Sequence, residues 1–221
     1  MWEAIGQLIP IALAAAVSTI PIMATILILV SDHRDQAAFP YSIGWVVGAA
    51  VFVTVATVAA EFLPEGRLRN RDAPVGALEI VIGGAMIVFG LLALRRRQAE
   101  STGRMPRWLT RVDSLDSVPA FGLGLALNVR PKALLLVAAA GLILRTASLD
   151  AEADVIAIAV YTAVATSTVV APVLLTFLSP DRMRPRLQAA RDWLTTHGHI
   201  VTALTMVVVG CLLLVVGFTN V

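Results

Sequence analysis

Charged and polar residues interrupt an apolar stretch in the second half of the sequence. Residues 122–141 read GLGLALNVRPKALLLVAAAG, and the middle of this run holds Asn128, Arg130, Pro131 and Lys132. Proline removes a backbone donor and disrupts a helix, and each cation at membrane depth costs about 2.5–3.5 kcal/mol on insertion scales. Such a centre is tolerated where protein or water surrounds it. We therefore expect a broken membrane helix whose cations face a cavity, with a ligand that is anionic or proton-coupled.

A second interrupted run lies near the start of the chain, in ALAAAVSTIPIMATILILV. Pro21 in this run precedes Pro131 by 110 residues, about half of the chain length of 221. An unwound centre exposes backbone amides and carbonyls, and the ends of the flanking half-helices carry partial charges that bind ions or polar groups. The two breaks predict a substrate site formed by Ser18, Thr19, Pro21, Asn128, Arg130, Pro131 and Lys132.

Composition places the chain in the class of integral membrane proteins. The hydrophobic fraction is 58% and the charged fraction 14%, far from the balance of a soluble domain. The net charge of +2 is small and its basic residues lie mostly in loops, which argues against nucleic acid as a partner. The lone Cys211 excludes an internal disulfide and a cysteine metal cluster. His197 and His199 have no acidic or cysteine neighbours at ligand spacing, so no metal site is expected.

The apolar runs predict an all-α protein with six transmembrane helices, of which the first and fourth are broken. The expected helices are an initial one that ends at residue 30, followed by 39–62, 75–94, 118–144, 155–178 and 200–218. The chain starts with an acidic residue and a run too long for a signal peptide, so the first helix is expected to be retained. Residues 1–94 form a first three-helix repeat, 95–117 a basic cytoplasmic linker, and 118–221 a second repeat.

Two repeats of three helices must run in opposite directions, which is the inverted-repeat arrangement of many transporters. Pro10 and Pro119 support a repeat at an offset of 109 residues. The third and sixth helices each carry two glycines seven residues apart, namely Gly83 with Gly90 and Gly210 with Gly217. The alternative is coincidence, because glycine and proline are common in membrane helices.

The distribution of basic residues predicts the orientation in the membrane. The turn after the first helix, the central linker and the loop after the fifth helix hold eleven basic residues, and the other two loops hold four. By the positive-inside rule the first set is cytoplasmic, so both termini are expected outside the bacterial inner membrane. Two amphipathic stretches are expected to contact an anionic leaflet through Arg104, Arg107, Arg111, Arg184, Arg186 and Arg191.

Further polar residues are candidates for ion coupling or for lining a pathway. Glu61 and Glu79 lie near helix ends and are candidate proton carriers, with interfacial groups as the alternative. The pathway candidates are Thr54, Thr57, Thr162, Thr166 and Ser167. Their alternative role is packing or bonding to the preceding helical turn. In the same way, Lys132 can instead extend to an interface, and Arg130 can serve as the structural partner of a carbonyl or an acid.

Six spans with these two breaks resemble the lysine-exporter superfamily. The first break reads Ser18-Thr-Ile-Pro21-Ile and the fourth reads Arg130-Pro-Lys132. Within the superfamily the chain is most similar to the GAP family, the peptidoglycolipid- and sulfolipid-addressing proteins. The family often has two prolines in the first break and Asn-Pro-Lys in the fourth. Here Thr19 replaces one proline, and Arg130 adds a fixed charge where an amide is usual.

The resemblance implies an exporter of a small molecule or glycolipid-related cargo, driven by an ion gradient without a nucleotide-binding domain. We expect alternating access between the two halves, with no enzymatic activity and no cofactor. The alternative is a non-transporting membrane partner of a cell-envelope lipid assembly or export complex, which would bind lipid or protein through its basic stretches. Helix faces rich in glycine and alanine would also allow a homodimer.

Overall fold

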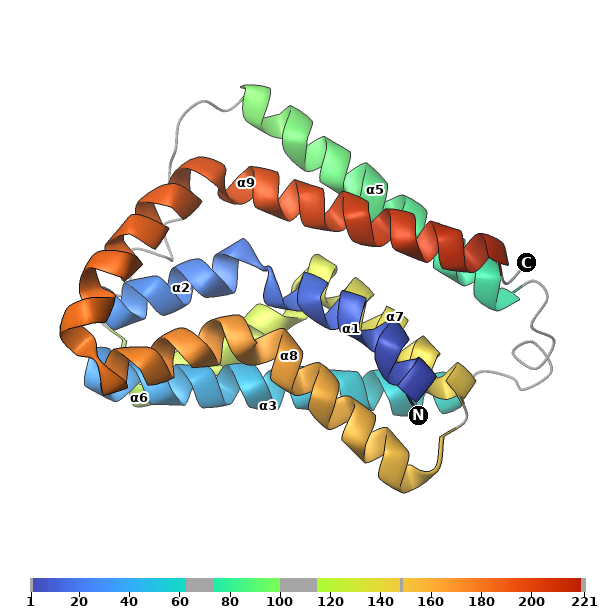
Figure 1. The fold of residues 1–221 in the computed structure, drawn as a ribbon, viewed down its shortest axis with the longest axis horizontal. Helices are drawn as coiled ribbons and strands as arrows, with labels where there is room; N and C mark the ends of the chain where they lie inside the picture. The colour runs from blue at the N-terminus through green and yellow to red at the C-terminus, as the bar shows by residue number, and fades with distance from the viewer. Residues whose placement is uncertain (1, 63–73, 100–114, 148, 220–221) are drawn as a thin grey trace.

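The protein is described by a computed structural model that covers residues 2–62, 74–99, 115–147 and 149–219. This part of the chain is all-α, as the sequence predicts (Figure 1). Its helices are α1 (Trp2–Ala16), α2 (Thr19–Val30), α3 (Arg34–Glu61), α5 (Pro74–Ala99), α6 (Ser117–Ala126), the short 3-10 helix η2 (Leu127–Val129), α7 (Pro131–Ala147), α8 (Ala151–Leu178) and α9 (Pro180–Thr219).

Between two and four membrane spans are supported by helix length and composition in the described ranges. α3 and α8 are each long and apolar enough to cross a membrane. α1 with α2, and α6 and η2 with α7, pass the same test as pairs, bent by 53° and 67° at their breaks. The expected breaks in the first and fourth helices are therefore present. α5 and α9 contain shorter apolar segments, Ile80–Leu92 and Ala203–Leu212, so a count of six spans stays a prediction.

Both breaks are followed by a proline in the first turn of the next helix. Pro21 is the third residue of α2, and Pro131 is the first residue of α7. The first four N–H groups of a helix have no partner within it, so proline loses no helical hydrogen bond there. The residues just before α2 and α7, Ser18 and Arg130, have extended backbones. This agrees with the steric exclusion of helical geometry before proline for Arg130.

The apolar core is divided into two clusters on either side of the breaks. One cluster is built mainly from α1, α3, α7 and α8, with contributions from α5 and α9, and includes Leu136 and Tyr161. The other is built around α2, the first half of α3 and the second half of α8, and includes Trp45 and Val169. Ser18 lies at a break between segments that belong to different clusters. A polar layer thus separates two apolar layers along the length of the broken helices.

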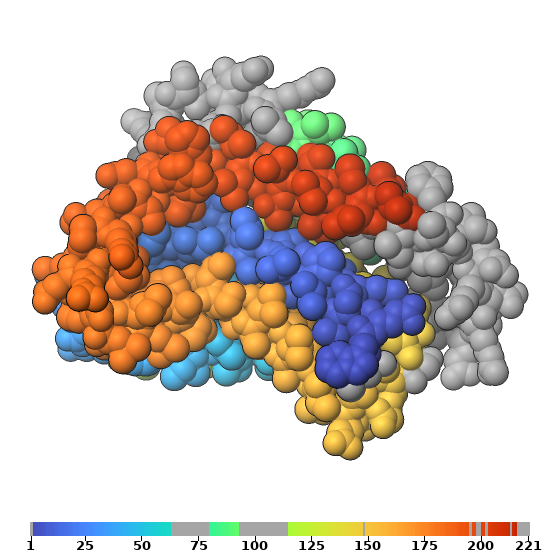
Figure 2. All heavy atoms as spheres, in the orientation of Figure 1, coloured from blue at the N-terminus to red at the C-terminus, as the bar shows by residue number. Residues whose placement is uncertain are grey.

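The region after the fifth helix differs from the expected loop. α9 runs without interruption from Pro180 to Thr219 and joins the predicted amphipathic stretch to the predicted sixth helix, with a bend visible in Figure 1. Leu187 is buried in the second core cluster, and Met183 and Ala190 pack against it. The apolar side of this stretch therefore contacts the protein, which explains why it stays helical. In Figure 2, α1 and α2 remain visible between α9 and α8.

The structure describes the predicted leaflet-contacting arginines of the second amphipathic stretch but not those of the first. Arg184 and Arg186 are exposed on α9, and Arg191 is partly exposed. Their contact with an anionic leaflet stays a prediction. Arg104, Arg107 and Arg111 lie outside the described residues.

Small residues let the helices that surround the breaks approach closely. A Cβ added at Gly124 in α6 would overlap the Tyr41 carbonyl oxygen and lie 2.7 Å from the Trp45 nitrogen, both in α3. On the other side of the molecule, a Cβ at Gly210 in α9 would lie 2.7 Å from the Gly83 carbonyl oxygen in α5. Backbone atoms cannot move aside as flexible side chains do. The packing of α6 against α3 and of α9 against α5 therefore depends on these glycines.

We predict that Gly124→Ala destabilises the protein by about 1–3 kcal/mol, because overpacking forces the backbones of α6 and α3 apart. Gly122 is the matched control in the same helix, since an added Cβ there meets no described atom within 4 Å. Thermal unfolding of the two variants in detergent measures the difference. Equal unfolding temperatures for Gly122→Ala and Gly124→Ala would contradict the close contact.

Candidate functional site

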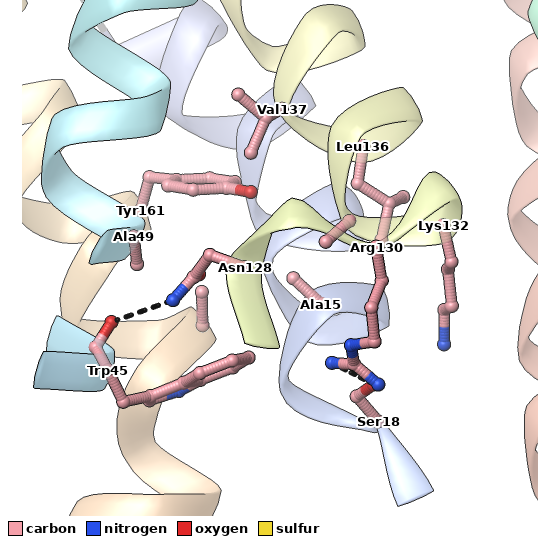
Figure 3. Close-up of a pocket in the computed structure, with 12 residues that line it drawn as sticks. Ala15, Ser18, Trp45, Ala49, Asn128, Arg130, Lys132, Leu136, Val137 and Tyr161 are labelled. Carbon is pink, nitrogen blue, oxygen red and sulfur yellow. Dashed lines mark hydrogen bonds between the residues drawn. The ribbon is translucent and has the colours of Figure 1, made fainter. Parts of the chain in front are cut away.

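A small cavity lies where the two broken helices meet. Its volume is about 20 Å³, counted as the space that the centre of a water-sized sphere can occupy. A cavity needs about 10–15 Å³ by this measure to hold one water. Figure 3 shows its walls, which come from α1, α3, α7, α8 and the break around Arg130. The lining residues are Ala15, Ser18, Trp45, Ala49, Asn128, Arg130, Lys132, Ala133, Leu136, Val137, Tyr161 and Ala165.

The cations of the second break donate hydrogen bonds to the first break. Lys132 Nζ donates to the Val17 carbonyl oxygen over 3.1 Å. Arg130 Nη2 donates to Ser18 Oγ over 3.2 Å, as drawn in Figure 3. Val17 follows the last residue of α1, where carbonyl groups have no partner further along the helix. Lys132 therefore supplies a donor to a group that the break leaves exposed.

Arg130 also binds its own break. Its Nε donates to the Leu127 carbonyl oxygen over 2.7 Å, close to the end of η2. A cation near the C-terminal end of a helix is stabilised by the partial negative charge there. Arg130 and Lys132 thus lie beside the C-terminal ends of two half-helices, α1 and the α6–η2 segment. The sequence analysis left open whether Arg130 serves as partner of a carbonyl, and the structure shows this contact.

Two neutral side chains complete the hydrogen bonding around the breaks. Thr168 in α8 donates through Oγ1 to the Ala16 carbonyl oxygen over 2.7 Å. Asn128 Nδ2 donates to the Gly124 carbonyl oxygen over 3.0 Å and to the Trp45 carbonyl oxygen over 3.4 Å. The first contact fixes α8 to the end of α1, and the last fixes η2 to α3. Thr168 was absent from the sequence predictions, because a threonine in a Thr- and Ser-rich helix carries no distinguishing signal.

Positive charge in the cavity has no acidic partner. Neither Arg130 nor Lys132 has a carboxylate within 4.0 Å in the part of the chain that the structure describes. Both side chains are only partly exposed, and their charges act on each other. Hydrogen bonds to neutral oxygens satisfy donors but do not neutralise charge. The site therefore keeps an excess of positive charge inside a largely apolar helix bundle.

Trp45 and Tyr161 line the cavity, and neither was singled out in the sequence. The Trp45 side chain is 5% exposed, and its Nε1 has no hydrogen-bond partner among the described atoms. Buried indole N–H groups usually find an acceptor, so this donor is unusual. A tryptophan within an apolar helix is ordinarily a packing residue, so nothing in the sequence distinguished Trp45.

The predicted substrate residues divide into those that line the cavity and those that shape the breaks. Ser18, Asn128, Arg130 and Lys132 line it. Pro21 and Pro131 are not among the lining residues and lie in the first turns of α2 and α7, and Thr19 begins α2. The structure therefore brings together four of the seven residues around one space. Their role in binding stays a prediction.

The predicted pathway residues do not line this cavity. Thr57 and Thr166 are buried and donate to carbonyl oxygens one turn earlier, in Val53 and Thr162. Thr54 and Ser167 are exposed and bond within their own helices. Thr162 is buried, and its hydroxyl has no partner in the described ranges.

Of the two predicted ion-coupling residues, Glu61 lies away from the cavity. Glu61 ends α3, twelve residues beyond Ala49 in the cavity wall, or about 18 Å along a helix. It lies within electrostatic reach of Asp154 near the start of α8, a residue that the sequence analysis did not select. Glu79 lies in α5, and its side chain is outside the described residues. Their coupling role remains a prediction.

Comparison with known families identifies the chain. A family model described as "Sap, sulfolipid-1-addressing protein" matches residues 8–219. The chain belongs to this sulfolipid-addressing family. The match confirms the resemblance to the sulfolipid-addressing proteins that the two breaks suggested. Together with the apolar helices, this lipid-related family indicates a membrane protein. Searches of curated proteins and of solved structures gave no match.

In this member of the sulfolipid-addressing family, we predict that Thr168→Val destabilises the protein. The change leaves the Ala16 carbonyl oxygen without its side-chain donor, and hydrogen bonds between membrane helices contribute about 0.6–1.7 kcal/mol. Ser167→Ala is the matched control, because Ser167 is exposed and donates only within α8 to the Val164 carbonyl oxygen. Unfolding in detergent compares the two variants. An equal loss of stability in both would show that Thr168 does not connect α8 to α1.

Proposed function

We propose that the chain is a secondary transporter of the lysine-exporter superfamily that exports lipid-related or other small cargo. The observation that carries the proposal is the contact between two broken spans, in which Arg130 and Lys132 reach across to Ser18 and Val17 beside a small cavity. Discontinuous helices that meet near the bilayer midplane are typical of substrate sites in secondary transporters. Cargo transfer by such a site requires no covalent chemistry and no cofactor.

The proposed mechanism is alternating access between two inverted halves of three helices each. The contacts between helices support this arrangement. α1 packs on α8, α6 and α7 pack on α3, and α5 packs on α9. A twofold axis that exchanges the first and fourth spans also exchanges the second with the fifth and the third with the sixth. Under that exchange, the pairing of α1 with α8 corresponds to the pairing of α6 with α3.

The proposed cargo is related to a sulfolipid, because the family description names the addressing of sulfolipid-1. An ion gradient would drive export, with Glu61 or Glu79 as the proton carrier. We further propose a location in the bacterial inner membrane with both termini outside, on the grounds of the uneven distribution of basic residues.

The topology predicts which positions are accessible from outside the cell. In a Cys211→Ser background, a cysteine at Glu3 should react with a membrane-impermeant maleimide in intact cells. A cysteine at Arg182, at the start of α9, should react only after the cells are permeabilised. Reaction of both positions in intact cells would contradict the six-span topology, because five spans, an odd number, lie between these positions and place them on opposite sides.

The site assignment predicts that Lys132→Ala abolishes transport while the protein stays folded. Purified protein is reconstituted into vesicles that contain a fluorescent sulfated glycolipid, and a pH gradient is imposed. Chemical quenching of the label from outside measures lipid movement. The wild type should exceed protein-free vesicles, and Lys132→Ala should not. Arg182→Ala is the matched control, since it removes an exposed cation from α9 that is not among the predicted leaflet contacts. Gel filtration and thermal unfolding check that each variant is folded.

Transport by Lys132→Ala at the wild-type rate would reject the site. The alternative function, a non-transporting partner of a lipid-assembly complex, has its own signature in cells. Deletion of residues 104–111 would then remove sulfolipid from the cell surface, whereas Lys132→Ala would leave it unchanged. The reverse pattern supports transport through the central site.

A further inference from the structure

We propose that the central cavity is a binding site for one compact anionic group, held by Arg130 and the indole N–H of Trp45, with the charge of Lys132 adding to the attraction. This inference rests on the proposed function, because it assigns the chemical class of the ligand that the proposed transport site binds. The shared chemistry is a small, singly charged anion, either a free inorganic ion or the acidic group of a lipid.

The first evidence for an anion site is the charge balance of the cavity. Two cations line it, and neither has a carboxylate within 4.0 Å among the residues that the structure describes. Removal of charge from water is costly unless an opposite charge accompanies it. The N-terminal end of α7, which begins with Pro131 beside the cavity, adds a partial positive charge. An anion is therefore the ligand that this surface stabilises most.

The unpaired donor of Trp45 carries the second step, and it is independent of the cations. Trp45 is more than nine-tenths buried, lines the cavity, and has no described acceptor for its Nε1. In Figure 3 the indole ring extends from α3 toward the side of the cavity where Ser18 and Arg130 lie. Burial of an unsatisfied donor is unfavourable, and a bound acceptor removes that cost.

The size of the cavity selects a compact group. Its volume of about 20 Å³ for the centre of a water-sized sphere is close to the about 10–15 Å³ that one water needs, which favours a compact group. A halide or the acidic end of a larger molecule fits this space. Leu136 and Val137 on the wall offer no hydrogen-bond donor or acceptor, so an anion is held away from this part of the wall.

Anion binding would change the contacts that connect the two breaks. Lys132 Nζ now donates to the Val17 carbonyl oxygen, and Arg130 Nη2 donates to Ser18 Oγ. Charged acceptors form stronger hydrogen bonds than neutral ones, so an anion competes with both oxygens for these donors. Occupation of the site therefore weakens the connection between α1 and α7 at the point where both spans are broken.

Fluorescence of Trp45 tests the proposal directly. The full chain carries Trp2→Phe, Trp108→Phe and Trp193→Phe, so that Trp45 is the remaining tryptophan. Sodium bromide is titrated in detergent at constant ionic strength, with sodium gluconate as the bulky replacement. We expect saturable quenching, because bromide quenches an indole on contact. Caesium gluconate, a quencher of opposite charge, should give no saturable quenching.

Charge variants decide whether the quenching comes from the site. Lys132→Met should weaken bromide binding about tenfold or more, as expected for the loss of a charged hydrogen bond. Arg182→Gln removes an exposed charge elsewhere and should leave the curve unchanged. Linear quenching of equal slope in all three proteins would overturn the proposal.

A second variant keeps the test valid if Lys132→Met does not fold. Trp45→Phe in the otherwise native chain removes the indole donor and keeps an aromatic side chain. Bromide should raise the thermal unfolding temperature of the native protein by more than that of Trp45→Phe. An equal rise in both would show that Trp45 does not hold the anion.

Methyl sulfate distinguishes the two sources of the anionic group. Displacement of bromide by sodium methyl sulfate assigns the site to acidic ester groups such as those of a lipid, and saturable bromide binding without displacement assigns it to a free ion. Saturable binding in a protein that fails to transport would reject the proposed function alone. Transport without saturable binding would reject the anion site alone.

Discussion

Satisfaction of backbone hydrogen bonds at the two breaks is the constraint on which the rest of this structure depends. In an apolar interior, a carbonyl freed by the end of a helix must find a donor. Here the Val17 carbonyl receives Lys132, the Leu127 carbonyl receives Arg130, and the Ala16 carbonyl receives Thr168. The second break supplies donors to the first, so neither break is complete without the other. This dependence places α1 beside α7 and divides the core into two apolar clusters.

Close contact between backbones is the second requirement, because side chains can reach across the breaks only if the surrounding helices are near. Gly124 lets α6 lie directly against α3, and Asn128 then reaches the Trp45 carbonyl oxygen of α3. On the far side, Gly210 brings α9 against α5 in the same way. Small residues therefore determine the width of the helix bundle, and polar residues determine where its two layers meet.

The sequence was sufficient for features that depend on local rules. Proline and cations within apolar runs predicted both broken helices, and four residues chosen from them line one cavity. Contacts between residues far apart in the chain could not be predicted from the sequence. Trp45 and Thr168 have no local signal, since their roles depend on which helix lies next to them. The continuous α9 was missed for the same reason, because Leu187 is buried only once α2 and α8 are in place. Glu61 lies at the end of α3, where the sequence placed it, and its role in ion coupling stays a prediction.

The two cations near the middle of a broken span also have an electrical consequence. A charge that crosses the full membrane potential changes in energy by about 2.3 kcal/mol for every 100 mV. Arg130 and Lys132 are both attached to the second break, whereas Ser18 at the first break carries no charge. A rearrangement that shifts the second break relative to the first therefore moves net charge through part of the membrane field. The resting voltage of the cell would then favour one position of the broken helix over the other, even before any cargo binds.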